Sequence, residues 1–158
     1  MEYNFHTMGN ETGLGEGRRT AGENIYEPCD SLPTKYQPAC YHEQVEWWES
    51  IVNLDWQKIS QLCKTLSDNQ ENSKACYLAI GHYAAIRNNF NADLAAEICS
   101  ILPTAETRAL CSGRAAWLII NEPGERTSDP YILCKQLESP YNKQCEDRLN
   151  SYKPLNKT

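Results

Sequence analysis

The 158-residue chain lacks an excess of basic residues, since 15 Lys and Arg stand against 21 Asp and Glu, for a net charge of −6. A nucleic-acid-binding protein normally presents a basic face, and the only adjacent basic pair is Arg18-Arg19, so we do not expect this class. The longest apolar runs, such as residues 115–120, are too short to span a bilayer. The first residues are polar, so no signal peptide is expected either.

Motifs of catalysis and cofactor binding are also absent. The sequence has no Gly-x-Ser-x-Gly, no HExxH and no phosphate-binding loop, and the glycines of residues 13–17 lack the strand–turn–helix context of a dinucleotide site. No Cys-x-x-Cys occurs, and no Cys–His cluster has zinc-finger spacing, so a structural zinc site is not expected. The sequence therefore predicts a non-enzymatic protein with no cofactor.

No stretch alternates polar and apolar residues with period two, so no β-sheet is expected. Four segments instead carry apolar residues at helical spacing, each with Cys-x-x-Leu followed by a helix breaker, which is Pro in three of them. These segments are residues 21–33, 56–67, 92–103 and 129–140. A second helical series, with Cys near each start, alternates with the first; it begins at Ala39, Ala75, Leu110 and Gln144.

Both series repeat about every 35 residues, and such a period built from two helices is typical of a solenoid. We expect an all-α protein: one right-handed α-solenoid of antiparallel helix pairs that spans residues 1–158. Glycines at 13, 15 and 17 predict a loop or a frayed, partly disordered start over residues 1–20. The expected repeats are residues 4–33, 38–67, 74–103 and 109–139, followed by a half repeat at 143–152.

Eight cysteines, an even number, indicate disulfides and therefore an oxidising compartment. Each first-series Cys is followed by a second-series Cys at the start of the next helix, so the two can meet across a turn. The expected pairs are Cys29–Cys40, Cys63–Cys76, Cys99–Cys111 and Cys134–Cys145. The alternative is a twin-Cys hairpin with both members of a pair on one helix. Prolines between the paired cysteines argue against continuous helices there.

The unit that starts at Cys76 resembles a tetratricopeptide (TPR)-type repeat or its Sel1-like relative. Ile80-Gly81 stands where that family has its Leu-Gly pair, and Pro103 stands at the family's terminal Pro. Two other copies keep the small residue of the first helix, as Gly9 and Ala116. Two copies depart from it, with Val45 and Asn150 at that position.

The resemblance implies that the first helix of each pair lines a concave groove. The groove positions would lie two and six residues beyond each second-series Cys, with a third position one turn further. They are His6, Asn10, His42, Glu46, Glu49, Leu78, His82, Ala85, Gly113, Trp117, Ile120, Asp147 and Ser151. All three histidines of the chain fall on this expected surface.

Three interpretations of the groove stay open. The positions can contact a ligand, with Trp117 stacking on a sugar ring or a peptide side chain. His6, His42 and His82 can bind a metal ion such as zinc, nickel or copper. The histidines can also be a solvated polar floor. The remaining tryptophans are expected to pack in the core: Trp47, Trp48 and Trp56.

We expect a secreted or cell-surface interaction module that binds a peptide, a glycan or a partner protein on its concave face. The compartment would be extracellular, cell-surface or periplasmic, and Asn10 and Asn156 begin N-glycosylation acceptor motifs. One alternative is a structural subunit that stacks end to end into a filament. The other is a metal-binding protein that uses the histidines. No nucleic acid and no membrane span are expected.

Overall fold

The computed structural model describes residues 24–122 and 128–151, and within these ranges all regular structure is helical. Two short 3-10 helices come first, η1 (Cys29–Ser31) and η2 (Thr34–Tyr36). The α-helices follow: α2 (Gln37–Ile51), α3 (Trp56–Thr65), α4 (Gln70–Arg87), α5 (Ala92–Ser100), α6 (Ala105–Asn121), α7 (Ile132–Lys135) and α8 (Tyr141–Ser151). The prediction of an all-α protein is confirmed for these residues.

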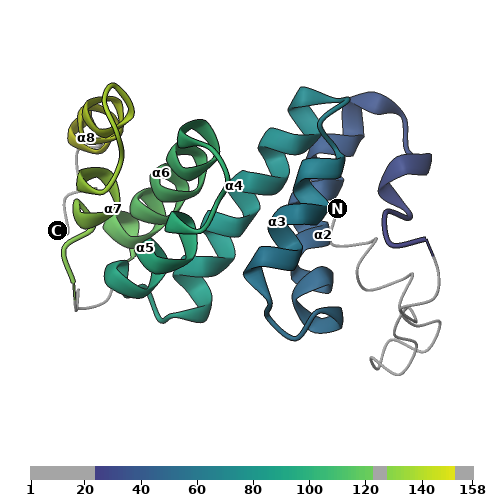
Figure 1. Cartoon of the computed structure of the whole chain (residues 1–158), viewed down its shortest axis with the longest axis horizontal. Helices are drawn as coiled ribbons and strands as arrows, with labels where there is room; N and C mark the ends of the chain where they lie inside the picture. The colour runs from purple at the N-terminus through teal and green to yellow at the C-terminus, as the bar shows by residue number, and fades with distance from the viewer. Residues whose placement is uncertain (1–23, 123–127, 152–158) are drawn as a thin grey trace, which may run out of the picture.

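The helices follow one another along the long axis of the molecule in chain order (Figure 1). Their contacts divide them into two alternating sets. The even helices α2, α4, α6 and α8 pack in series, each against the next. The odd helices α3, α5 and α7 each contact the even helices before and after them. Helix α4, the longest, sits at the middle and contacts α2, α3, α5 and α6.

Polar side chains begin most of these helices by accepting hydrogen bonds from free amides of the first turn. Asp55 accepts from the amide of Lys58, and Asn91, one repeat later, accepts from the amide of Leu94. Asn69 caps α4 in the same way. Thr104 caps α6 within a capping box. Because of these two caps, α4 and α6 begin about one turn earlier than the sequence pattern predicted.

The turns after α2 and α4 share an uncommon backbone conformation, one repeat period apart. Asn53 and Leu54 have φ of 54° and 59°, and Asn89 and Phe90 have φ of 50° and 59°. In each turn the second residue donates its amide to a carbonyl five residues earlier, at 2.9 Å and 2.8 Å. The next residue then caps the following helix. Two neighbouring copies of the repeat therefore reverse direction by the same mechanism.

All four sequential disulfides are present as predicted, and each joins one helical element to the even helix that follows. The Cα atoms of each pair lie 5.4 to 5.5 Å apart, inside the normal range for a disulfide. The twin-Cys alternative is excluded because the paired residues lie on different elements. Four disulfides indicate an oxidising, non-cytosolic compartment.

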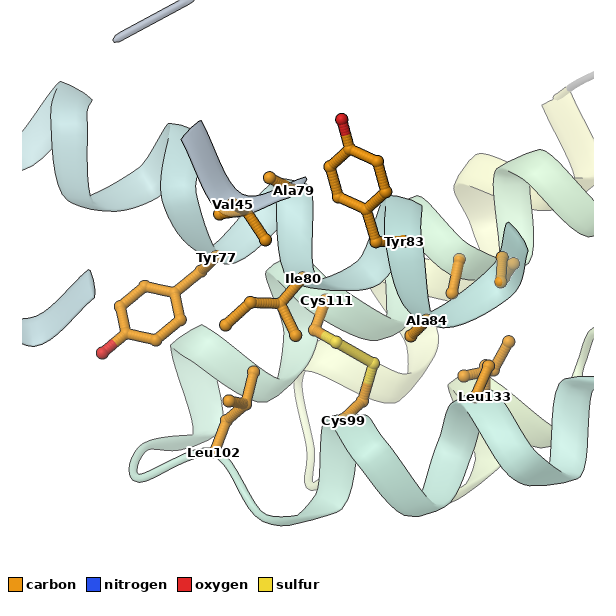
Figure 2. Packing of buried hydrophobic residues seen from close by; sticks show 14 of the residues in the cluster. Val45, Tyr77, Ala79, Ile80, Tyr83, Ala84, Cys99, Leu102, Cys111 and Leu133 are labelled. Atoms are coloured by element: carbon orange, nitrogen blue, oxygen red, sulfur yellow. A yellow bond between two sulfur atoms is a disulfide. The ribbon is translucent and has the colours of Figure 1, made fainter. Parts of the chain in front are cut away.

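The core is a continuous cluster of buried side chains between the two sets of helices. Figure 2 shows the sulfur–sulfur bond of Cys99–Cys111 below Ile80, with Leu102 on one side and Leu133 on the other. Trp48 is fully buried, as predicted, and its indole N–H donates to the carbonyl of Ile25 at 2.9 Å. The disulfides therefore serve as apolar core groups as well as crosslinks.

Gly81 lies at a close contact between α4 and α6. A Cβ built at this glycine would collide with the carbonyl group of Cys111 and would lie 2.9 Å from its Cα atom. These are backbone atoms, which cannot rotate away as a flexible side chain can. Glycine is therefore required here by the close approach of two helices.

Two predicted helices differ from the structure. The segment over residues 21–33 is described only from residue 24, and there it forms turns and the short helix η1. Pro28 lies in the middle of the segment and supplies no amide donor, which prevents a continuous helix. The helix expected over residues 129–140 contracts to the four residues of α7.

Because of the contact at Gly81, replacing glycine by alanine should have opposite effects on stability at Gly81 and at Gly113. Gly81→Ala is expected to lower the free energy of unfolding by about 2 kcal/mol, because the methyl group forces α4 away from α6. Gly113→Ala is the matched control, since a Cβ at Gly113 meets nothing within 4 Å. The control should raise stability by about 0.5–1 kcal/mol through helix propensity. Urea denaturation measures both, and equal stabilities of the two variants would contradict this packing.

Candidate functional site

A pocket of about 440 Å³ opens on the even helices. Its lining residues come from α2, α4, α6 and α8: His42, Leu78, Gly113, Arg114, Trp117 and Arg148. Four of these six are groove positions that the TPR resemblance implied, two or six residues beyond a second-series Cys. The even helices thus bring four of the expected groove positions to one pocket.

The sequence prediction missed Arg114 and Arg148. Each lies three residues beyond a second-series Cys, beside the predicted positions at two and six. A helix face that lines a pocket is about 100° wide, so residues at two, three and six share it. Counting the third position would have found both arginines. The same count marks Glu43 on α2, which contacts His42.

Two of the predicted histidines meet at one edge of the pocket. The rings of His42 and His82 pack edge to face with their centroids 5.3 Å apart. Nδ1 of His42 lies 3.0 Å from the Glu43 carboxylate. Nδ1 of His82 accepts a hydrogen bond from the Arg114 guanidinium at 3.0 Å. Because a guanidinium can only donate, the proton of neutral His82 lies on Nε2.

His82 is held in its neutral form. Burial lowers the pKa of His82 to about 4 from its usual 6.5, and the positive charges of His42 and Arg114 act in the same direction. A buried imidazole beside a guanidinium gains a proton at a high cost. This ring is therefore a fixed hydrogen-bond acceptor for Arg114 at neutral pH.

The NMR titration of His82 is predictable from this environment. Its ring resonances should stay at neutral-form shifts from pH 7.5 down to pH 5.5, because its folded-state pKa lies near 4. The spectrum of a His82→Gln variant assigns the signals. Arg114→Gln removes one source of positive charge and should raise the midpoint. A His82 midpoint near its usual 6.5 in the unaltered protein would contradict this burial.

Trp117 forms the aromatic wall of the pocket. The Arg114 guanidinium carbon lies 4.8 Å from a ring centroid of Trp117, which is cation–π distance. Arg114 therefore bridges His82 and Trp117 and keeps a positive charge at the pocket wall. Trp117 therefore lies at the pocket as expected, with its indole half-buried and the Arg114 guanidinium over its ring.

A second pocket of about 330 Å³ continues the first along α4, α6 and α8. The two pockets share Leu78, Gly113 and Arg148. The second adds apolar and polar side chains in nearly equal number: Lys74, Glu106, Ala109, Leu110, Tyr141, Gln144 and Cys145. We call the two pockets together the even-helix groove.

The predicted positions Glu46 and Glu49 lie elsewhere, beside a third pocket of about 630 Å³ between α2 and α4. Arg87 joins both carboxylates, with N–O distances of 2.8 Å to Glu49 and 3.2 Å to Glu46. Only 2% of the Glu49 side chain is exposed. Burial raises the pKa of Glu49, and the hydrogen bond and charge of Arg87 counteract the rise only in part. Glu49 thus acts mainly as a buried link between helices.

The Arg87–Glu49 pair predicts a pH-dependent loss of stability. Arg87→Gln leaves an unpaired buried carboxylate and should cost about 3 kcal/mol at pH 7.5. The pKa of Glu49 in the folded variant then lies still further above its unfolded value, so the folded state binds the extra proton. The loss should therefore shrink as the pH falls toward 5.

Chemical denaturation at the two pH values measures this effect. The control is Lys135→Gln, which removes an exposed pair with Asp129 and should cost less than about 1 kcal/mol. A loss in Arg87→Gln that matches the control, or that grows on acidification, would contradict the buried role of Glu49.

The metal and glycosylation hypotheses involve residues that lie partly outside the described ranges. Within residues 24–122 and 128–151, no three His, Cys, Asp or Glu side chains form a group that could hold a metal ion. His6, the third histidine of the metal hypothesis, lies outside the described residues, as do Asn10 and Asn156. Of the helices described, none has the length and apolar character needed to cross a membrane.

Comparisons of the chain with known protein families, with curated proteins and with solved structures give no match. The geometry of the even-helix groove is therefore the basis for assigning a function.

Proposed function

We propose that this protein is a non-enzymatic interaction module that holds a peptide, a glycan or a segment of a partner protein in the even-helix groove. The observation that carries the proposal is the convergence of His42, Leu78, Gly113 and Trp117 on one pocket, as the TPR resemblance implies for a ligand-binding face. Aromatic, apolar and cationic groups together are typical of recognition sites.

The proposed architecture is a right-handed α-solenoid of TPR-like helix pairs. Three features support it: the serial packing of the even helices, the matching turns with positive φ after α2 and α4, and the small residue Gly81 at a helix crossing. A solenoid presents one continuous face formed by equivalent helices of successive repeats, and this face is its usual binding surface. The even helices are the equivalent helices here.

The proposed location is extracellular, at the cell surface or in a periplasm. Four disulfides support it, because such bonds persist where thiols are not kept reduced. A peptide, glycan or protein partner in the same compartment would meet the groove directly.

Blocking the groove tests this function. Gly113→Phe should fill the pocket from its floor without a backbone clash, because a Cβ there points into open space. Binders are first selected on the unaltered protein from a random peptide library and a glycan array. Their affinities are then compared by surface plasmon resonance for the unaltered protein, Gly113→Phe and the control Gly113→Ala.

We expect binders whose affinity falls at least about tenfold in Gly113→Phe, a change of about 1.4 kcal/mol, and stays within about twofold in Gly113→Ala. Circular dichroism confirms that both variants are folded. If every binder tolerates Gly113→Phe, the groove is not the binding face and the proposal fails.

A further inference from the structure

We infer that the even-helix groove binds an acidic peptide segment, whose carboxylate pairs with Arg148 and whose neighbouring apolar side chain packs on Trp117 and Leu78. This inference rests on the proposed function and names the ligand class of the same groove. Its basis is the charge, the exposure and the apolar lining of the two pockets.

The charge of the first pocket is opposite to that of the whole protein. Two arginines and a histidine line it, and none of its lining residues is acidic. The chain as a whole carries −6. A basic pocket on an acidic protein attracts anionic ligands, while the remaining surface repels them. Charge complementarity therefore favours a negatively charged occupant.

Arg148 is the residue best placed to bind that charge. It lies exposed on α8 and lines both pockets. Its side chain forms no ion pair or hydrogen bond with any other residue in the described part of the chain, where only its backbone carbonyl accepts a hydrogen bond, from Ser151. A guanidinium has five N–H donors in a planar fork that matches a carboxylate. Arg148 can therefore bind a carboxylate without giving up an existing partner there.

Arg114 has a different task, because the fold already orients it. Its hydrogen bond to His82 and its stacking on Trp117 hold the guanidinium at the wall of the first pocket. It contributes positive charge from a fixed position, so little side-chain entropy is lost when a ligand binds. The acceptor role of neutral His82 maintains this orientation.

The lining favours a peptide over a densely charged glycan. Besides the cations, the groove offers apolar surface, and Glu106 in the second pocket would repel a continuous run of sulfates or carboxylates. The apolar contributors are Leu78, Ala109, Leu110, Trp117 and Tyr141. An extended peptide advances about 3.3 Å per residue, so it can alternate acidic and apolar side chains along two adjoining pockets.

The test compares matched charge reversals on peptides selected from a random library. Selection on the unaltered protein should enrich Asp and Glu next to apolar residues. Arg148→Glu should lower the affinity of these peptides at least about tenfold, and Arg148→Lys should lower it less. The control is Lys64→Glu, which makes the same change in net charge on an exposed residue of the odd helix α3. It should leave the affinity nearly unchanged.

Other outcomes would overturn the inference. Enriched peptides that are neutral or basic, yet lose binding in Gly113→Phe, would leave the proposed function standing and remove the acidic ligand class. If sulfated glycans bind through Arg148 and acidic peptides do not, the ligand class of the groove is a sulfated glycan and the peptide inference is wrong. Affinity that is unaffected by Arg148→Glu would exclude the carboxylate contact. If no ligand depends on Gly113, the proposed function fails together with the inference.

Discussion

The close approach of α4 and α6 at Gly81 is the contact on which the rest of the arrangement depends. The residue that α4 meets there, Cys111, is itself tied to α5 through Cys99. One point therefore fixes three helices: a glycine allows two backbones to touch, and a disulfide holds the third. Helix α4 also contacts α2 and α3, so its position determines how α2 and α3 are placed relative to α5 and α6.

The same spacing creates the even-helix groove. Gly81 is followed directly by His82, which accepts the hydrogen bond of Arg114 from the neighbouring helix. Leu78, almost one turn before Gly81, and Gly113, two residues beyond Cys111, line both pockets. A wider separation of α4 and α6 would break the His82–Arg114 contact and change the shape of the groove. Stability and the proposed binding face thus share one structural cause.

The sequence predicts the disulfides well because each pair joins two helical elements that are consecutive in the chain. A cysteine near the end of one element and a cysteine near the start of the next can meet across the turn. The prediction fails where local chemistry competes with periodicity, as at Pro28. It also misses partners that depend on helix packing. Arg87 on α4 forms an ion pair with the buried Glu49 on α2, and Arg114 on α6 donates a hydrogen bond to His82 on α4. Neither contact can be predicted from the spacing of one residue type.

NMR chemical-shift mapping can show where an acidic peptide binds on the protein. An acidic peptide selected on the protein is titrated into the uniformly 15N-labelled chain with all four disulfides intact. We predict that the largest shifts fall on the even helices, around Leu78, Gly113, Trp117 and Arg148, with little change on α3 and α5. Shifts concentrated on α3 and α5, or absent from the groove residues at saturation, would contradict it.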